Sequence, residues 1–189
     1  MSLKSNAANI ITLVRIACIP LMVFVFFYST ENTRPISALI FIIAALTDWL
    51  DGWVAREFDQ MSKLGAFLDP VADKLIVCIA LLIILQSDPT MVNTLISIVI
   101  IGREISISAL REWMSELGER HQVSVIGFSK LKTILQMVGI SCMLFQNPIL
   151  EIDIYQAGLF ALIFASILTV WTMIIYLLKA WPFLQGNID

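Results

Sequence analysis

Four aspartates lie within or beside apolar stretches of this chain, at spacings that repeat along a helix. Asp48 and Asp51 are three residues apart, and Asp69 and Asp73 are four apart. Residues three or four apart share one face of an α-helix, so two neighbouring helices could each aim two carboxylates at one point. Carboxylates gathered in an apolar setting cannot all stay ionised without positive charge nearby. The sequence therefore predicts a site in which Lys, Arg or a hard divalent cation compensates these groups.

The apolar setting follows from the composition. Of the 189 residues, 59% are hydrophobic and only 14% are charged, with a mean hydropathy of +0.88. A soluble domain has about 25% charged residues, so the natural solvent of this chain is the bilayer. Ionisable groups inside membrane segments are costly and usually functional, which argues against ordinary interfacial charges. The three cysteines are scattered in apolar runs, a pattern that favours neither a disulfide framework nor a zinc site.

Six apolar segments could supply the helices that position these residues. They are residues 10–28, 35–54, 65–85, 91–110, 132–145 and 155–178. A helix needs about 20 residues to span a bilayer, so we expect the short fifth segment to include part of residues 127–131. Open sheet edges are not tolerated in lipid. We therefore expect an all-α integral membrane protein with six transmembrane helices in a single catalytic domain, residues 1–189.

The loop charges predict the orientation of these segments. Lysines and arginines gather at alternate connections, whereas the opposite connections contain only Arg34. Cytoplasmic loops of membrane proteins are enriched in Lys and Arg. Both termini are therefore expected in the cytoplasm, with the four aspartates near the cytoplasmic face.

The residues from Asp48 to Asp73 follow the pattern D-x-x-D-G-x-x-A-R-x8-G-x-x-x-D-x-x-x-D. This pattern resembles the signature of the CDP-alcohol phosphotransferase family, and every specified position is present. The stretch from Asn9 to Arg15 is similar to the family's N-x-x-T-x-x-R motif at the entry into the first helix. The resemblance extends over about residues 6–178 and implies the six-helix bundle of that family.

The resemblance implies roles for each aspartate. Asp48, Asp51 and Asp69 would bind metal, and Asp73 would be both metal-associated and the general base. The expected cofactor is Mg²⁺ or Mn²⁺, with two ions, because these hard cations can bridge carboxylates and a diphosphate.

The resemblance also implies a CDP-binding set, which comprises Gly52, Arg56, Asn9 and Thr12. Arg56 can donate two parallel hydrogen bonds to a phosphate, and Gly52 leaves room for a ligand beside the helix backbone. The expected donor substrate is CDP-diacylglycerol. Asp73 would take the proton of an acceptor hydroxyl, whose oxygen would attack the lipid-side phosphorus and release CMP.

Four basic residues near the fourth and fifth segments form a candidate anion site for the acceptor: Arg103, Arg111, Lys130 and Lys132. Membrane anchoring alone could explain some of them. Together they suit an acceptor with its own phosphate, such as glycerol 3-phosphate. The stretches 69–74 and 103–113 resemble the bacterial family members that use this acceptor. The resemblance implies an enzyme of the bacterial inner membrane, a homodimer, with its active site facing the cytoplasm.

Other functions are compatible with the same residues. The acceptor could instead be inositol phosphate or serine. Intramembrane aspartates could line a divalent-cation transporter, although they cluster at one face. A non-catalytic membrane scaffold would need none of the aspartates. Release of CMP from CDP-diacylglycerol distinguishes the enzyme from the last two.

Overall fold

The computed structural model describes the backbone of residues 3–28, 34–58, 63–118, 128–148 and 151–185. It describes the side chains of residues 12–28, 34–47, 67–118, 131–148, 151–183 and 185. These residues form six helices and no strand: α1 (Leu3–Tyr28), α2 (Arg34–Phe58), α3 (Lys63–Ser87), α4 (Met91–Glu116), α5 (Phe128–Phe145) and α6 (Ile154–Leu184). The predicted all-α fold is confirmed over the described part of the chain.

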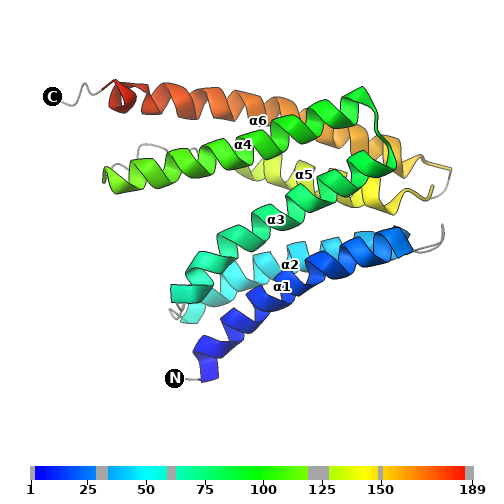
Figure 1. Cartoon of the computed structure of the whole chain (residues 1–189), viewed down its shortest axis with the longest axis horizontal. Helices are drawn as coiled ribbons and strands as arrows, with labels where there is room; N and C mark the ends of the chain where they lie inside the picture. The colour runs from blue at the N-terminus through cyan, green and yellow to red at the C-terminus, as the bar shows by residue number, and fades with distance from the viewer. Residues whose placement is uncertain (1–2, 29–33, 59–62, 119–127, 149–150, 186–189) are drawn as a thin grey trace.

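The helices alternate in direction. In Figure 1, α1, α3 and α5 run one way and α2, α4 and α6 run the other, so α1 begins at the side where α6 ends. Helix α5 packs closely along α6, and it also contacts α2 and α3. Helices α1, α2 and α3 contact one another, and α4 joins α3 to α6. The first three helices and the last three thus meet where α5 packs against α2 and α3 and where α4 packs against α3.

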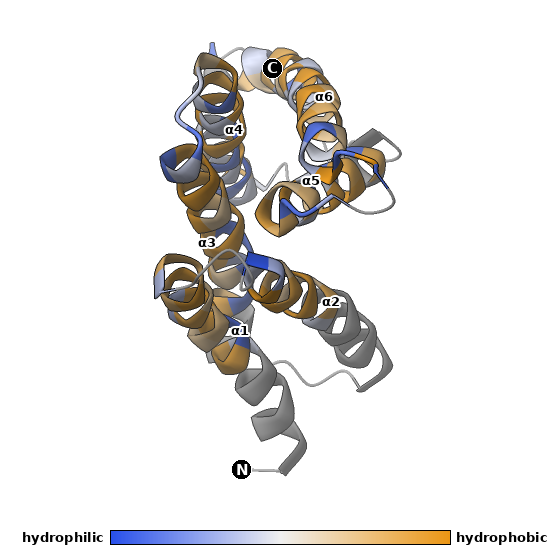
Figure 2. Cartoon of the chain, turned by 90° about the vertical axis from the view of Figure 1, so that its right-hand side faces the viewer, coloured by the Kyte–Doolittle hydropathy of each residue, from blue (hydrophilic) through white to orange (hydrophobic). Residues whose placement is uncertain are grey.

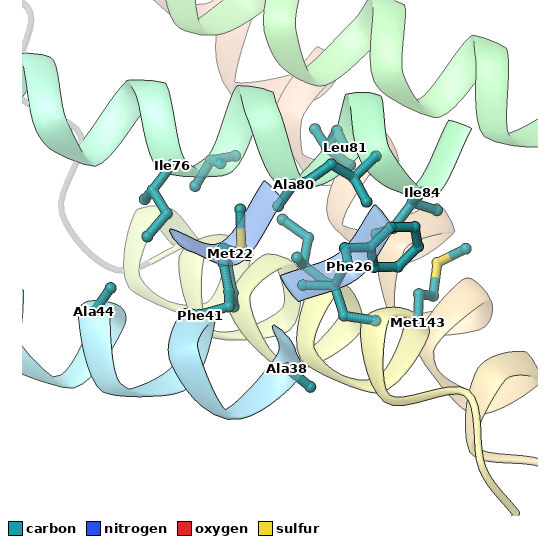
Figure 3. Close-up of a cluster of buried hydrophobic side chains, with 14 of the residues drawn as sticks. Met22, Phe26, Ala38, Phe41, Ala44, Ile76, Ala80, Leu81, Ile84 and Met143 are labelled. Atoms are coloured by element: carbon teal, nitrogen blue, oxygen red, sulfur yellow. The ribbon is translucent and has the colours of Figure 1, made fainter. Parts of the chain in front are cut away.

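The core arises from a regular spacing of apolar residues. In α1 the buried apolar positions are Ile19, Met22 and Phe26, which recur every three or four residues and so form one stripe along the helix. Similar stripes on α2, α3 and α5 face it, and Figure 3 shows Met22 and Phe26 among Phe41, Ile84 and other apolar side chains. A second, smaller cluster joins the end of α4 to the end of α6: Ile107, Met114, Tyr176 and Ala180.

A polar cluster joins three helices at the opposite end of the bundle. The Tyr155 hydroxyl donates a hydrogen bond to Asp88 Oδ2 at 2.5 Å, and Asn93 Nδ2 donates to the same oxygen at 3.0 Å. Thr90 caps the start of α4 by accepting a bond from the Asn93 backbone N–H, and Asp153 caps α6 in the same way. The ends of α3, α4 and α6 are therefore held together away from the aspartates.

The exterior of the bundle is apolar. Large side chains stand exposed around it, among them Phe24, Ile98, Phe160, Phe164 and Trp171. In Figure 2, hydrophobic colouring covers most of the turns of the helices that it colours. Two helical stretches, Met91–Glu116 and Ile154–Phe183, are long and apolar enough to cross a membrane by length and composition. Such a surface is unfavourable in water, so the fold agrees with the predicted bilayer environment.

The helices extend beyond the apolar segments from which they were predicted. Helix α4 continues to Glu116, six residues past the expected end, and α5 begins at Phe128. The extra turn of α5 confirms that the short fifth segment includes part of residues 127–131. The added residues at the end of α4 and the start of α5 lie outside the apolar segments. They stay helical because backbone hydrogen bonds form regardless of side-chain polarity.

Candidate active site

Asp69 and Asp73 continue the buried stripe of α3. The stripe contains Ile76, Ala80 and Ile84, and the two aspartates precede it at the same helical spacing. Their side chains are 27% and 35% exposed. The core-facing side of α3 thus changes from apolar side chains to two carboxylates, and the predicted pairing of these two residues on one face is confirmed.

Arg15 compensates both of these carboxylates. It occupies a core position of α1, four residues before Ile19, and its side chain is fully buried. One nitrogen, Nη1, lies 2.9 Å from Asp69 Oδ1 and 2.6 Å from Asp73 Oδ1. A buried guanidinium needs such partners, because an unpaired charge in an apolar interior is very costly. The sequence predicted that Lys, Arg or a divalent cation compensates the aspartates. For Asp69 and Asp73, the structure shows an arginine in this role.

The other predicted ligands lie on helices α1, α2 and α5. Helix α2 places Asp48, Asp51, Gly52 and Arg56 in its C-terminal half, and α2 contacts both α1 and α3. Asn9 and Lys130 belong to α1 and α5. The surroundings of these six residues lie outside what the structure describes, so their convergence on the site stays a prediction. Thr12 is described, and it is buried one turn before Arg15.

The carboxylates whose positions the structure describes are suitable ligands for a hard cation. Asp69 and Asp73 present carboxylate oxygens, the ligand type that Mg²⁺ and Mn²⁺ prefer. Among the described side chains, no group of three or more His, Cys, Asp or Glu residues converges on one point. A metal centre at this place therefore needs further ligands, and Asp48 and Asp51 are the residues predicted to supply them.

A cavity of about 270 Å³ opens beside Asp73 and reaches α4 and α5. Its lining includes three of the four residues predicted to bind the acceptor: Arg103, Arg111 and Lys132. Thr133 and Gln136 of α5 and Lys74 of α3 complete its polar wall. The structure thus brings three predicted anion ligands and the predicted base into one cavity from three helices, α3, α4 and α5.

Arg103 and Lys132 are held by burial and by one carboxylate. Their side chains are only 8% and 4% exposed, and each continues the buried stripe of its helix. Glu104 Oε1 lies 2.5 Å from Arg103 Nη1 and 3.6 Å from Lys132 Nζ. Two cations from different helices therefore share a single oxygen at the cavity wall.

Arg111 is more exposed and is positioned by an aromatic ring. Its Nη2 donates a hydrogen bond of 2.9 Å to the Tyr176 hydroxyl, and its guanidinium lies 5.2 Å from the centre of the same ring. Tyr176 itself is buried in the cluster between α4 and α6. The C-terminal helix thus orients a cation of the cavity without lining it.

Three participants were not among the predicted site residues: Arg15, Glu104 and Tyr176. Arg15 has a usable signal, since it is an arginine in an apolar run and the last residue of the N-x-x-T-x-x-R motif. Glu104 was visible only as a neighbour of Arg103. Tyr176 is 65 residues from Arg111, and no local pattern connects the two.

This arrangement suits a reaction between an anionic substrate and a hydroxyl group. The cations can bind a phosphate, and Asp73 lies in the same cavity, where a carboxylate can accept a proton. The Arg15 guanidinium donates a hydrogen bond to the same carboxylate and so fixes its position.

Comparisons with known proteins agree with this chemistry. The sequence profile of the CDP-alcohol phosphatidyltransferase family matches residues 5–180. The chain is 44% identical over 188 residues to the CDP-diacylglycerol–glycerol-3-phosphate 3-phosphatidyltransferase of Haemophilus influenzae, covering 99% of this chain and 100% of that protein. It is 43% identical to the protein of the same name from Salmonella typhimurium and 42% identical to that of Escherichia coli. Both alignments cover 94% of this chain and 96% of the relative.

Proposed function

Because this chain belongs to the CDP-alcohol phosphatidyltransferase family, we propose that it transfers the phosphatidyl group of CDP-diacylglycerol to glycerol 3-phosphate. The products are phosphatidylglycerophosphate and CMP. The observation that carries this function is the cavity in which Asp73 lies beside Arg103, Arg111 and Lys132. A neutral alcohol would not need these three cations, whereas a phosphorylated acceptor does.

Asp73 acts as the general base. It accepts the proton of the acceptor hydroxyl, whose oxygen forms a new bond to the lipid-side phosphorus of the diphosphate. The bond from that phosphorus to the CMP oxygen breaks, and CMP leaves with the electron pair. The Arg15 guanidinium keeps the Asp73 carboxylate oriented.

The acceptor phosphate binds to the basic wall of the cavity. Arg103 and Lys132 provide two buried cations, and Arg111 adds a planar donor held by Tyr176. Lys130, in the first turn of α5, is the fourth proposed ligand. Binding the phosphate at this wall leaves the hydroxyl end of a small acceptor free to approach Asp73, which lines the same cavity.

The diphosphate of the donor lipid is held where α2 faces α3. Asp48, Asp51, Asp69 and Asp73 would hold divalent metal, with Mg²⁺ or Mn²⁺ and two ions as the proposed form. A metal held by these carboxylates would supply positive charge to the diphosphate. The position of Asp48, four residues after the buried Ala44 on α2, supports this assignment.

The CDP moiety is proposed to contact Gly52 and Arg56 of α2 together with Asn9 and Thr12 of α1. The contact between α1 and α2 supports this grouping, because it brings the two helices that contain these residues together. Arg56 can donate two parallel hydrogen bonds to one phosphate group, and Gly52 leaves space for the ligand beside the helix backbone.

The enzyme is membrane-bound, with an apolar exterior. We propose six transmembrane helices in a single domain, both termini in the cytoplasm and the active site facing the cytoplasm across the bacterial inner membrane. The alternating helix directions support termini on one side. A homodimer stays a prediction from the family resemblance.

Release of CMP tests this function. The purified protein in mixed micelles with CDP-diacylglycerol is given glycerol 3-phosphate, inositol phosphate or serine, each with Mg²⁺, with Mn²⁺ or with a chelator. We expect CMP release with glycerol 3-phosphate and either cation, and none with the chelator. Release with serine but not with glycerol 3-phosphate would contradict the proposed acceptor, and full activity with the chelator would contradict the metal.

A further inference from the structure

A carboxylate stands in the wall of a cavity proposed to bind a phosphate. Glu104 lines the cavity together with Arg103, Arg111, Lys132 and Lys74. A carboxylate close to phosphate-binding cations weakens anion binding, because it repels the anion and neutralises its ligands. Its presence there calls for a physical explanation.

The contacts of Glu104 are specific. Neighbouring residues of a helix point in different directions, so the 2.5 Å contact between Arg103 and Glu104 requires both side chains to turn toward each other. Lys132 reaches the same oxygen from α5 at 3.6 Å. Arg103 and Lys132 are almost fully buried, and a buried cation without a counter-ion is strongly unfavourable. Glu104 is therefore what makes it possible to bury two cations in the same place.

Arg103 keeps one donor that the carboxylate does not use. Arg103 Nη1 is bound to Glu104, but Arg103 Nε is buried and has no hydrogen-bond partner among the described residues. Among the described residues, the lining contains four cations and two carboxylates, an excess of two positive charges. That excess matches a phosphate monoester dianion, the charged end of the proposed acceptor.

Resting on the proposed function, we propose that Glu104 sets the affinity and selectivity of the acceptor cavity for a phosphate monoester. It is the internal counter-ion that positions Arg103 and Lys132 before the acceptor binds and shares them with the phosphate afterwards. The product keeps this phosphate monoester, so a carboxylate that weakens phosphate binding also lets the product leave. Glu104 is a positioning residue and takes no part in the proton transfer.

Direct binding of inorganic phosphate to the purified protein, measured by calorimetry without CDP-diacylglycerol, tests the proposal. In Glu104→Gln, which keeps an oxygen that accepts a hydrogen bond from Arg103 but removes the charge, phosphate should bind about tenfold more tightly. Glu112→Gln is the matched control, because Glu112 is an exposed carboxylate on the same helix. Equal effects of the two changes, or weaker binding in Glu104→Gln, would overturn the proposal.

Two further measurements test whether Glu104→Gln acts at the phosphate-binding cations and on the acceptor alone. Lys132→Gln should weaken phosphate binding and reduce the gain from Glu104→Gln in a double-mutant cycle, since Lys132 and Glu104 share the site. In steady-state assays, Glu104→Gln should lower the KM for glycerol 3-phosphate and leave the KM for CDP-diacylglycerol unchanged. A protein that binds phosphate as expected but releases no CMP with this acceptor contradicts the proposed function and leaves Glu104 as an anion-site residue.

Instability of the variant gives a further readout. If Glu104→Gln unfolds at a lower temperature, added inorganic phosphate should restore its midpoint toward that of the unchanged protein, because phosphate replaces the missing counter-ion. A midpoint that stays low at saturating phosphate would overturn the proposal.

Discussion

The polar residues of the site occupy positions that would otherwise belong to the core. Arg15, Asp73, Arg103 and Lys132 each continue the buried stripe of a different helix. A charged side chain at such a position costs free energy unless neighbouring helices bring partners to it. The ion pairs of Arg15 with Asp73, and of Arg103 and Lys132 with Glu104, are those partners. At this scale, a charge that interrupts an apolar stripe indicates a functional position.

Asp73→Asn tests the proposed base. The amide cannot take a proton from the acceptor hydroxyl, so kcat should fall by about 10²–10⁴-fold. Binding of inorganic phosphate to the cavity should persist, which shows that the variant is folded. Glu116→Gln, an exposed change on α4, should leave CMP release unchanged. Full activity of Asp73→Asn would remove this residue from the mechanism.

Arg15→Met tests whether a buried guanidinium organises the two carboxylates. Breaking a buried ion pair costs about 3–5 kcal/mol, so the thermal unfolding midpoint in detergent should fall markedly. Added Mg²⁺ should recover part of the loss, because a cation replaces the missing charge, and Arg15→Lys should lose less than Arg15→Met.

The matched control for that change is Arg34→Met. Arg34 is a partly buried cation at the start of α2, where it lies over the Phe26 ring and away from the aspartates. Its replacement should cost little stability and give no response to Mg²⁺ beyond that of the unchanged protein. Equal losses in the two variants would show that Arg15 contributes only general stability.

At the scale of elements, the closest helix pair is α5 with α6. A Cβ added at Gly158 would lie 2.8 Å from the Gly139 carbonyl oxygen, and one added at Gly139 would lie 2.8 Å from Leu162 Cγ. Small residues let helix backbones approach this closely, which favours packing of helices in membranes. Helix α5 contains Lys132, which lines the cavity, and helix α6 contains Tyr176, which orients Arg111, so this contact supports both residues.

Gly158→Ala should therefore loosen the bundle. The new methyl group meets backbone and Cβ atoms that cannot move easily, so the cost should be about 1–3 kcal/mol of stability. Gly102→Ala on α4 is the control, because an added Cβ there meets nothing within 4 Å, and alanine favours a helix. Thermal unfolding in the same detergent compares the two variants. A Gly158→Ala protein as stable as Gly102→Ala would show that the helices can separate without loss.

At the scale of the whole molecule, the two ends of the bundle differ. One end holds the ion pairs and the cavity, and the other holds the Asp88–Asn93–Tyr155 hydrogen bonds. Between them the exterior is apolar. This polarity agrees with a membrane enzyme that is open to soluble acceptors at one face only.

Cysteine labelling tests the proposed orientation. In a background with Cys18, Cys78 and Cys142 changed to alanine, Ser115→Cys at the end of α4 should react with an impermeant maleimide only from the cytoplasmic side. Asn147→Cys, after α5, should react only from the outside. Both positions are exposed, so access depends on the side of the membrane. Labelling of the two from the same side would contradict the six-span arrangement.

The sequence by itself determined the helical class, the number of helices and the pairing of Asp69 with Asp73 on one face. These properties follow from local periodicity and composition, which a single segment contains. Only the tertiary structure decided that Arg15 serves the two carboxylates, that Glu104 joins Arg103 to Lys132, and that Tyr176 orients Arg111. These pairings depend on how each helix is rotated against its neighbours, and that rotation is set by side-chain packing between segments far apart in the chain.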